Sequence, residues 1–180
     1  MIVLGIDPGT AVTGFGVIAT DETTAVGGRR AAQGFIGTPR LVECGVIRTS
    51  ARAPLATRLM DIFDGVTELI ARHHPDSLAV EDAFYSRNVR TTLVLGHARG
   101  VVLLAGEKAG VAVLEYAPAL IKKTVVGRGG ATKEQVQFMV ARLLNLKHPP
   151  QPTDAADGVA CALTCVLSAG LARLRKRAFA

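Results

Sequence analysis

Hydrophobic positions along the chain fall into two patterns, short apolar runs and helical stripes. Ile2–Ile6 is an apolar run closed by the turn signal Asp7-Pro8-Gly9, and Thr13–Ala19 predicts a second strand paired with the first. Similar runs predict further strands at Leu41–Arg48, Ser77–Val80 and Val111–Tyr116.

Between these strands the apolar residues recur at helical spacing. Pro54 opens a helix whose apolar face is formed by Leu55, Leu59, Ile62, Phe63, Val66, Leu69 and Ile70. Thr132 predicts a helix start as N-cap, with Gln135 at the capping-box position. The helices expected after the first are 89–108, Pro118–Val126, Thr132–Leu146 and Asp154–Arg177.

The order of elements predicts the fold class. Three strands in sequence, followed by alternating helices and strands, favour an α/β, ribonuclease H-like arrangement: a five-stranded mixed sheet with helices on both faces. We expect residues 1–180 to form a single domain. A Gly-rich, aperiodic segment at about 22–40 predicts a flexible insertion. Its Arg29-Arg30 pair could reach DNA, but a disordered hairpin tip is the favoured interpretation.

The basic residues are clustered rather than spread. The net charge is +6. Between Ala117 and Pro150 the only acid is Glu134, whereas the basic residues there are Lys122, Lys123, Arg128, Lys133, Arg142 and Lys147. The tail adds Arg173, Arg175, Lys176 and Arg177. Such clustering suits contact with a phosphate backbone.

The cysteines and the N-terminus indicate where the protein works. Cys44, Cys161 and Cys165 have no metal-site spacing, and the last two fall on an apolar helix as free thiols. The N-terminal sequence has no signal-peptide pattern, and no apolar run is long enough for a bilayer. We therefore expect a soluble protein in the reducing cytoplasm.

Four carboxylates carry the candidate chemistry. Asp7 and Glu81 each follow an apolar strand, and strand ends are where open α/β sheets collect their active sites. Asp154 and Asp157 lie three residues apart at a helix start and so share a face. Their mutual repulsion favours hard divalent cations, and two such ions can support in-line attack on a phosphodiester.

Each acid also has a simpler interpretation. Asp7 could simply initiate a turn, and Asp154 could simply cap a helix. Asp157 could be a surface charge that compensates the helix dipole. Glu81 is harder to explain this way, because it ends a buried strand. Asp82 beside it is expected to be solvated, since adjacent strand residues face opposite sides.

Five segments resemble one known family. They are Ile2–Gly16 (IVLGIDPGTAVTGFG), Val80–Asn88 (VEDAFYSRN), Leu95–Gly100 (LGHARG), Tyr116–Val126 (YAPALIKKTVV) and Asp154–Val159 (DAADGV). In this order they resemble the RuvC family of Holliday-junction resolvases over most of the chain. The segment at about 22–40 looks longer than the family usually carries.

The resemblance implies an activity and a site. It implies a homodimer that nicks four-way junctions symmetrically with Mg²⁺ or Mn²⁺ in DNA recombination and repair. It also suggests cooperation with a branch-migration motor. The matching metal-binding acids are Asp7, Glu81, Asp154 and Asp157. Lys122 and Lys133 match lysines near the scissile phosphate, and Lys122 would stabilise the transition state.

Further DNA contacts are expected from aromatic and basic residues. Phe84 matches an aromatic that the family uses at distorted bases, because a ring can stack on any unpaired base. Its neighbour Tyr85 is a second candidate, although either ring could pack in the core. Lys123 and Arg128 are candidate phosphate contacts, with a solvated lysine and a flexible Gly-rich loop as the alternatives.

Three other functions compete with this hypothesis. The Gly5–Thr10 hairpin also looks like the first phosphate loop of actin-like ATPases and sugar kinases, but 180 residues do not accommodate their two domains. A related nuclease of structured RNA and a DNA-binding module without activity are the others. Apolar residues beside Gly96, Ala98 and Gly100 predict that the helix at 89–108 packs against a second copy.

Overall fold

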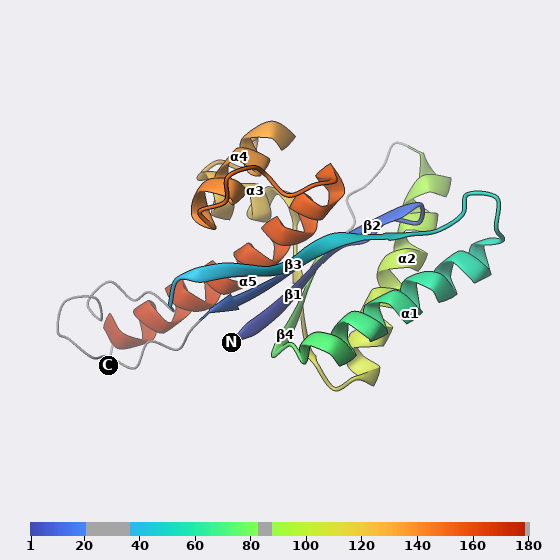
Figure 1. Ribbon diagram of the computed structural model, residues 1–180, viewed down its shortest axis with the longest axis horizontal. Coiled ribbons are helices and arrows are strands. Elements are labelled where there is room, and N and C mark those ends of the chain that lie inside the picture. The colour runs from blue at the N-terminus through green and yellow to red at the C-terminus, as the bar shows by residue number, and fades with distance from the viewer. Residues whose placement is uncertain (21–36, 83–87, 179–180) are drawn as a thin grey trace.

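Five strands form one mixed sheet, in the order β3-β2-β1-β4-β5 (Figure 1). The computed structural model describes residues 1–20, 37–82 and 88–178, and side chains of the last helix as far as residue 169. β1 (Ile2–Asp7), β2 (Val12–Thr20) and β3 (Pro39–Arg48) pair antiparallel. β4 (Ser77–Glu81) and β5 (Ala112–Tyr116) continue the sheet parallel to β1. The predicted fold is confirmed.

Helices cover both faces of this sheet. On one face lie α1 (Leu55–His73) and α2 (Val89–Lys108), and on the other lie α3 (Pro118–Val126), α4 (Lys133–Leu143) and α5 (Thr153–Ala178) (Figure 1). Each face has its own hydrophobic core. Burial of these two apolar layers is the main force that holds the helices on the sheet.

Strand alternation decides which face each site residue joins. In β1, Val3 belongs to the α5-side core, whereas Leu4 and Ile6 belong to the α2-side core. In β4, Ala79 belongs to the α5-side core and Leu78 belongs to the α2-side core. Because side chains alternate along a strand, Asp7 and Glu81 share the α5 side, and the residue after Glu81 turns toward α2.

Helix α5 lies unusually close to the sheet. A Cβ on Gly16 would meet Val159 Cα at 2.6 Å, and one on Gly158 would meet the Phe15 backbone at 2.5 Å. Glycine is needed here because nothing larger fits between helix and strand. Residues 158–166 of α5 are all buried, since the sheet lies on one side of the helix and α3 and α4 lie on the other.

Two predicted boundaries were wrong. The insertion predicted at about 22–40 falls mostly outside the described residues, but Pro39 and Arg40 already belong to β3, where Pro39 pairs with Thr20. The helix predicted to reach Leu146 ends at Leu143, because Asn145 has a left-handed backbone with φ of 52°. The predicted capping box of Thr132 and Gln135 is confirmed.

The cysteines agree with the sequence prediction of free thiols. Cys161 and Cys165 are buried free thiols, and Cys44 is a half-buried one. Among the described residues, no helix combines the length and apolar character that a membrane crossing requires.

Candidate active site

The four predicted carboxylates come from three elements that meet at one end of the sheet. Asp7 ends β1 and Glu81 ends β4, and these parallel strands are neighbours, with Ile6 paired to Val80. Asp154 and Asp157 lie in the first turns of α5. The charges of both interact with that of Asp7, and the charge of Asp157 also reaches Glu81. The tertiary structure therefore brings all four acids together.

Burial and repulsion perturb the two strand carboxylates strongly. Burial, followed by repulsion from Asp157, raises the pKa of Asp7 to about 7. Burial, followed by repulsion from Asp7, raises the pKa of Glu81 to about 8. Burial likewise raises the pKa of Asp157, against the hydrogen bond from Lys133. Such coupled, shifted acids are typical of functional sites.

Two lysines supply positive charge to this acidic cluster. Lys133, the first residue of α4, places Nζ 2.6 Å from Asp157 Oδ2 and 3.9 Å from Asp154 Oδ1. Lys122 on α3 is close enough for its charge to lower the pKa of Glu81 and that of Asp157. Both lysines predicted to lie near the reacting phosphate are therefore beside the carboxylates.

The chemistry of this donor set suits a hard cation. Carboxylate oxygens are the ligands that Mg²⁺ and Mn²⁺ prefer, and a divalent cation would relieve the repulsion that raises the pKa values of Asp7 and Glu81. As they stand, the Asp, Glu, His and Cys side chains of the described residues form no group of three or more that could hold a metal ion. Lys133 is the cation that pairs with Asp157 instead.

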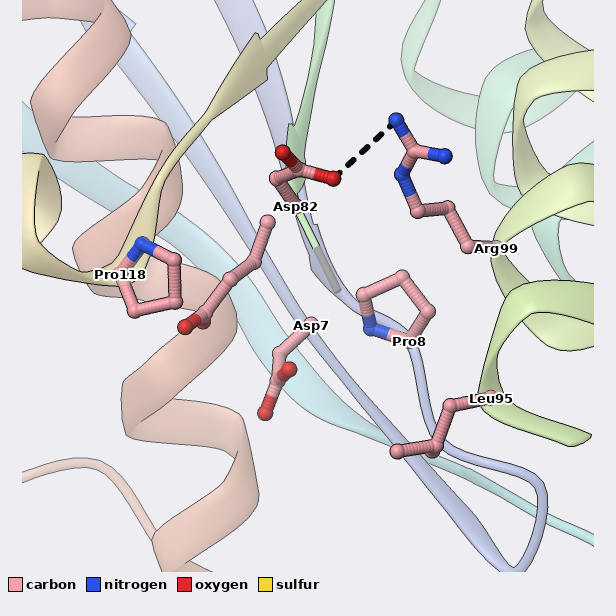
Figure 2. Close-up of a pocket in the computed structure, with 7 residues that line it drawn as sticks. Asp7, Pro8, Asp82, Leu95, Arg99 and Pro118 are labelled. Carbon is pink, nitrogen blue, oxygen red and sulfur yellow. Dashed lines mark ion pairs between the residues drawn. The ribbon is translucent and has the colours of Figure 1, made fainter. Parts of the chain in front are cut away.

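A pocket next to Asp7 contains residues that the sequence argument did not assign to the site. It is lined by Asp7, Pro8, Glu81, Asp82, Leu95, Arg99 and Pro118 (Figure 2). Asp82 was predicted to be solvated, and its side chain is indeed half exposed; it faces away from the acidic cluster, as alternation requires, and pairs with Arg99 on α2 at 3.2 Å. Sequence reasoning did not assign Arg99 to the site, although a charged residue within the LGHARG segment of that largely apolar helix indicates a specific contact.

The other residues predicted to contact DNA are not shown beside the acidic cluster. Phe84 and Tyr85 lie outside the described residues. Lys123 is exposed on α3 and is not among the charges that shift the carboxylate pKa values. Arg128 donates a hydrogen bond from Nη2 to Gln135 Oε1 at 2.7 Å, so it is attached to the start of α4 rather than directed at the acids.

The fold and the site together define a class of protein. A mixed sheet in this strand order, with acids at the ends of β1 and β4 and at the start of a helix laid across it, defines a ribonuclease H-like nuclease. The arrangement places acids at strand ends, where a phosphodiester can reach them.

Comparison with known proteins gives the family. The family profile described as crossover junction endodeoxyribonuclease RuvC matches residues 3–165. A relative of that name from Desulforamulus reducens is 44% identical over 166 residues, which cover 91% of each chain. The solved structure of Thermus thermophilus RuvC is 36% identical, with a TM-score of 0.81, and covers 96% of this chain and 97% of that one.

A second solved structure relates the fold to a substrate. T. thermophilus RuvC in complex with a Holliday junction is 33% identical, with a TM-score of 0.79, and covers 95% of this chain and 96% of that one. The chain belongs to the RuvC family of crossover junction endodeoxyribonucleases. It is thus a nuclease that acts on phosphodiester bonds.

Proposed function

We propose that this chain resolves Holliday junctions by paired symmetric nicks, in recombination and repair. The single observation that carries the proposal is the convergence of Asp7, Glu81, Asp154 and Asp157 at one end of the sheet, in a member of a junction-cutting family. The relative solved with a Holliday junction supports the choice of a four-way DNA substrate.

The proposed cleavage depends on Mg²⁺, for which Mn²⁺ can substitute. We expect two ions in each active site. Asp7, Glu81, Asp154 and Asp157 would hold them. When bound, such ions activate a water for in-line attack and neutralise charge on the phosphate and the leaving oxygen. The raised pKa values of Asp7 and Glu81 mean that cation binding releases protons from these carboxyl groups.

The lysines and the outer basic residues act on the DNA. Lys122 and Lys133 lie beside the carboxylates, so their ammonium groups stabilise the extra negative charge that develops on the attacked phosphate. Lys123 and Arg128 lie outside the acidic cluster, so we assign them the role of contacting the DNA phosphate backbone. Phe84 and Tyr85 stay predictions for stacking on unpaired bases.

We further propose a homodimer, because a two-fold junction needs two matched cuts. Helix α2 carries an exposed apolar stripe on one face, formed by Val89, Leu93, Gly96, Gly100 and Leu104. Gly96 and Gly100 leave open space where a Cβ would stand, so another helix can approach closely. Ala98, which the sequence also suggested for this contact, is buried inside its own chain. A branch-migration motor stays a prediction of the resemblance.

We infer that residues 1–180 form one nuclease domain. The support is that the two hydrophobic cores lie on opposite faces of a single sheet.

The experiment that tests the function compares wild type with Asp7→Asn on labelled four-way and linear DNA. We expect wild type to nick the four-way junction at symmetric positions in Mg²⁺ and to leave linear duplex intact. Asp7→Asn should bind the junction in Ca²⁺ as wild type does and lose cleavage in Mg²⁺ and Mn²⁺. Asp64→Asn, an exposed acid on α1, is the matched control and should cut normally.

Three results would contradict the proposal. Unchanged cleavage by Asp7→Asn would remove Asp7 from the mechanism. Junction binding by wild type without cleavage in either metal would indicate a DNA-binding module. Preferential cutting of RNA hairpins in direct competition would indicate the structured-RNA nuclease.

A further inference from the structure

Arg99 links helix α2 to the ends of both parallel strands beside the active site. Its Nη2 pairs with Asp82 Oδ1 at 3.2 Å and also with Glu115 Oε2 on β5. Asp82 is the residue immediately after Glu81, and Glu115 is paired in register with Val80. Figure 2 shows Arg99 on the wall of the pocket opposite Pro118, with Asp7 between them. One guanidinium group therefore joins α2, which carries it, to the ends of β4 and β5.

The backbone on either side of Glu81 is held as well. Glu81 pairs with Tyr116 at the last position of the β4–β5 ladder, and Asp82 N donates a hydrogen bond to Tyr116 O at 2.9 Å. Asp82 is exposed over about half of its side chain (49%), so the ion pair with Arg99 is the side-chain contact that restrains it. The direction of the Glu81 carboxyl depends on this strand end, since Glu81 is the last residue of β4.

Charge balance argues against a direct role for Arg99 on DNA phosphate. Its guanidinium already faces two carboxylates, so the group of three carries a net negative charge. Arg99 is absent from the charges that shift the pKa values of Asp7 and Glu81. Its Nε is buried and has no hydrogen-bond partner among the described residues, which costs stability rather than adding to it.

We propose that Arg99 is a positioning residue for Glu81: through Asp82 and Glu115 it fixes the end of β4, and so the place from which Glu81 reaches a cation. The inference rests on the proposed metal-dependent function of the same site. Because Arg99 lies on α2, whose outer face carries the proposed dimer stripe, it also joins the active site to the helix that would meet a second copy.

The test compares wild type with Arg99→Gln and Arg99→Lys. Without DNA, we expect Arg99→Gln to weaken Mn²⁺ affinity by roughly tenfold, the usual scale for losing a partner that orients metal ligands. Isothermal titration calorimetry measures this. In metal-free protein, NMR should show faster amide exchange at Asp82, whose hydrogen bond to Tyr116 O is no longer supported. Arg99→Lys keeps the charge and should recover part of both effects.

Arg72→Gln is the matched control, because Arg72 on α1 also pairs with two acids, Glu43 on β3 and Glu68 on α1, and none of the three lines the pocket beside Asp7. It should leave Mn²⁺ affinity and Asp82 exchange within about twofold of wild type. For Arg99→Gln, cleavage should fall in kcat while junction affinity in Ca²⁺ stays within about twofold.

Two outcomes would overturn the inference. Wild-type Mn²⁺ affinity and wild-type Asp82 exchange in Arg99→Gln, with only a lower melting temperature, would leave Arg99 a structural residue. Weaker junction binding with a shallower salt dependence would make it a phosphate contact. Absence of Mn²⁺ binding or junction cleavage in wild type would instead contradict the proposed function, and Asp82 exchange would still decide whether Arg99 fixes the strand end.

Discussion

Lys133 Nζ lies 2.6 Å from Asp157 Oδ2, inside the group of acids that we propose as cation ligands. The same ammonium is 3.9 Å from Asp154, and its charge lowers the pKa of Asp7. Lys133 therefore neutralises part of the cluster that a divalent cation would neutralise. In turn, the Asp157 hydrogen bond raises the pKa of Lys133, which keeps the ammonium charged. Cation and lysine compete for one carboxylate.

Lys133→Ala should therefore separate cation binding from catalysis. Without the ammonium, the cluster is more negative, and we expect Mn²⁺ to bind the DNA-free protein about three- to tenfold more tightly, equal to roughly 1 kcal/mol. Junction cleavage should nevertheless slow at least tenfold, because a cation beside the attacked phosphate is lost. Calorimetry and single-turnover cleavage measure the two effects. Lys147→Ala, an exposed lysine, is the control, and weaker Mn²⁺ binding in Lys133→Ala would contradict the competition.

Metal-free protein should lose stability as pH rises from about 4 to about 8. The pKa values of Asp7 and Glu81 are raised to about 7 and about 8 from 3.8 and 4.5, so the folded state binds more protons than the unfolded state in this window. Folding is therefore favoured at low pH, and that contribution disappears as the pH passes the folded pKa values.

Thermal unfolding in EDTA checks this pH dependence. We expect the melting temperature to fall by at least roughly 5 °C between pH 5 and pH 8, because each pKa unit corresponds to about 1.4 kcal/mol and each kcal/mol to about 2–4 °C in a chain of this size. The slope should be smaller in Asp7→Asn, whose amide cannot ionise, and unchanged in Asp64→Asn. Saturating Mg²⁺ should flatten the slope in wild type, because the two carboxyl groups are then ionised in both the folded and the unfolded state across this window. Equal slopes in wild type and Asp7→Asn would show that Asp7 is ionised normally.

Gly14→Ala should damage the site more than the fold. Gly14 pairs with Asp7, and a Cβ there would lie 1.9 Å from the Asp154 carbonyl oxygen, so α5 must shift away from the sheet. We expect Mn²⁺ affinity and cleavage to fall at least tenfold, because Asp154 and Asp157 move with the helix, and stability to fall by about 1–3 kcal/mol. Gly130→Ala has open space around its Cβ and should change neither. A Gly14→Ala protein that cuts normally would contradict this account.

The exposed stripe on α2 should control the oligomeric state. Leu104 is 58% exposed near the end of that stripe, and Leu104→Glu would place a charge in the proposed interface. We expect sedimentation velocity to show a dimer for wild type and a monomer for the variant. Paired nicks should then become single nicks, while Mn²⁺ affinity stays unchanged. Met60→Glu on α1, at a side chain with 62% exposure, is the control. A dimer that survives Leu104→Glu would place the interface elsewhere.

Local sequence determined the elements and their ends at most positions. The apolar runs gave the five strands to within one or two residues, because strand and helix periods depend on neighbouring positions alone. The capping box of Thr132 and Gln135 was readable for the same reason. The boundary error at β3 came from a distant partner, because Pro39 joins the strand where Thr20 lies beside it. Residues 158–166 of α5 are all buried for a similar reason, because the sheet lies on one side of them and α3 and α4 lie on the other.

The sequence by itself also determined which four acids belong together, since Asp7 and Glu81 end apolar strands and Asp154 and Asp157 share a helical face. Only the tertiary structure decided what surrounds them. The pairing of Lys133 with Asp157 and of Arg99 with Asp82 joins residues 24 and 17 positions apart, at distances set by how helices pack on the sheet. The shifted pKa values of Asp7 and Glu81 arise in the same way, because burial and repulsion depend on three-dimensional position, which no local pattern encodes.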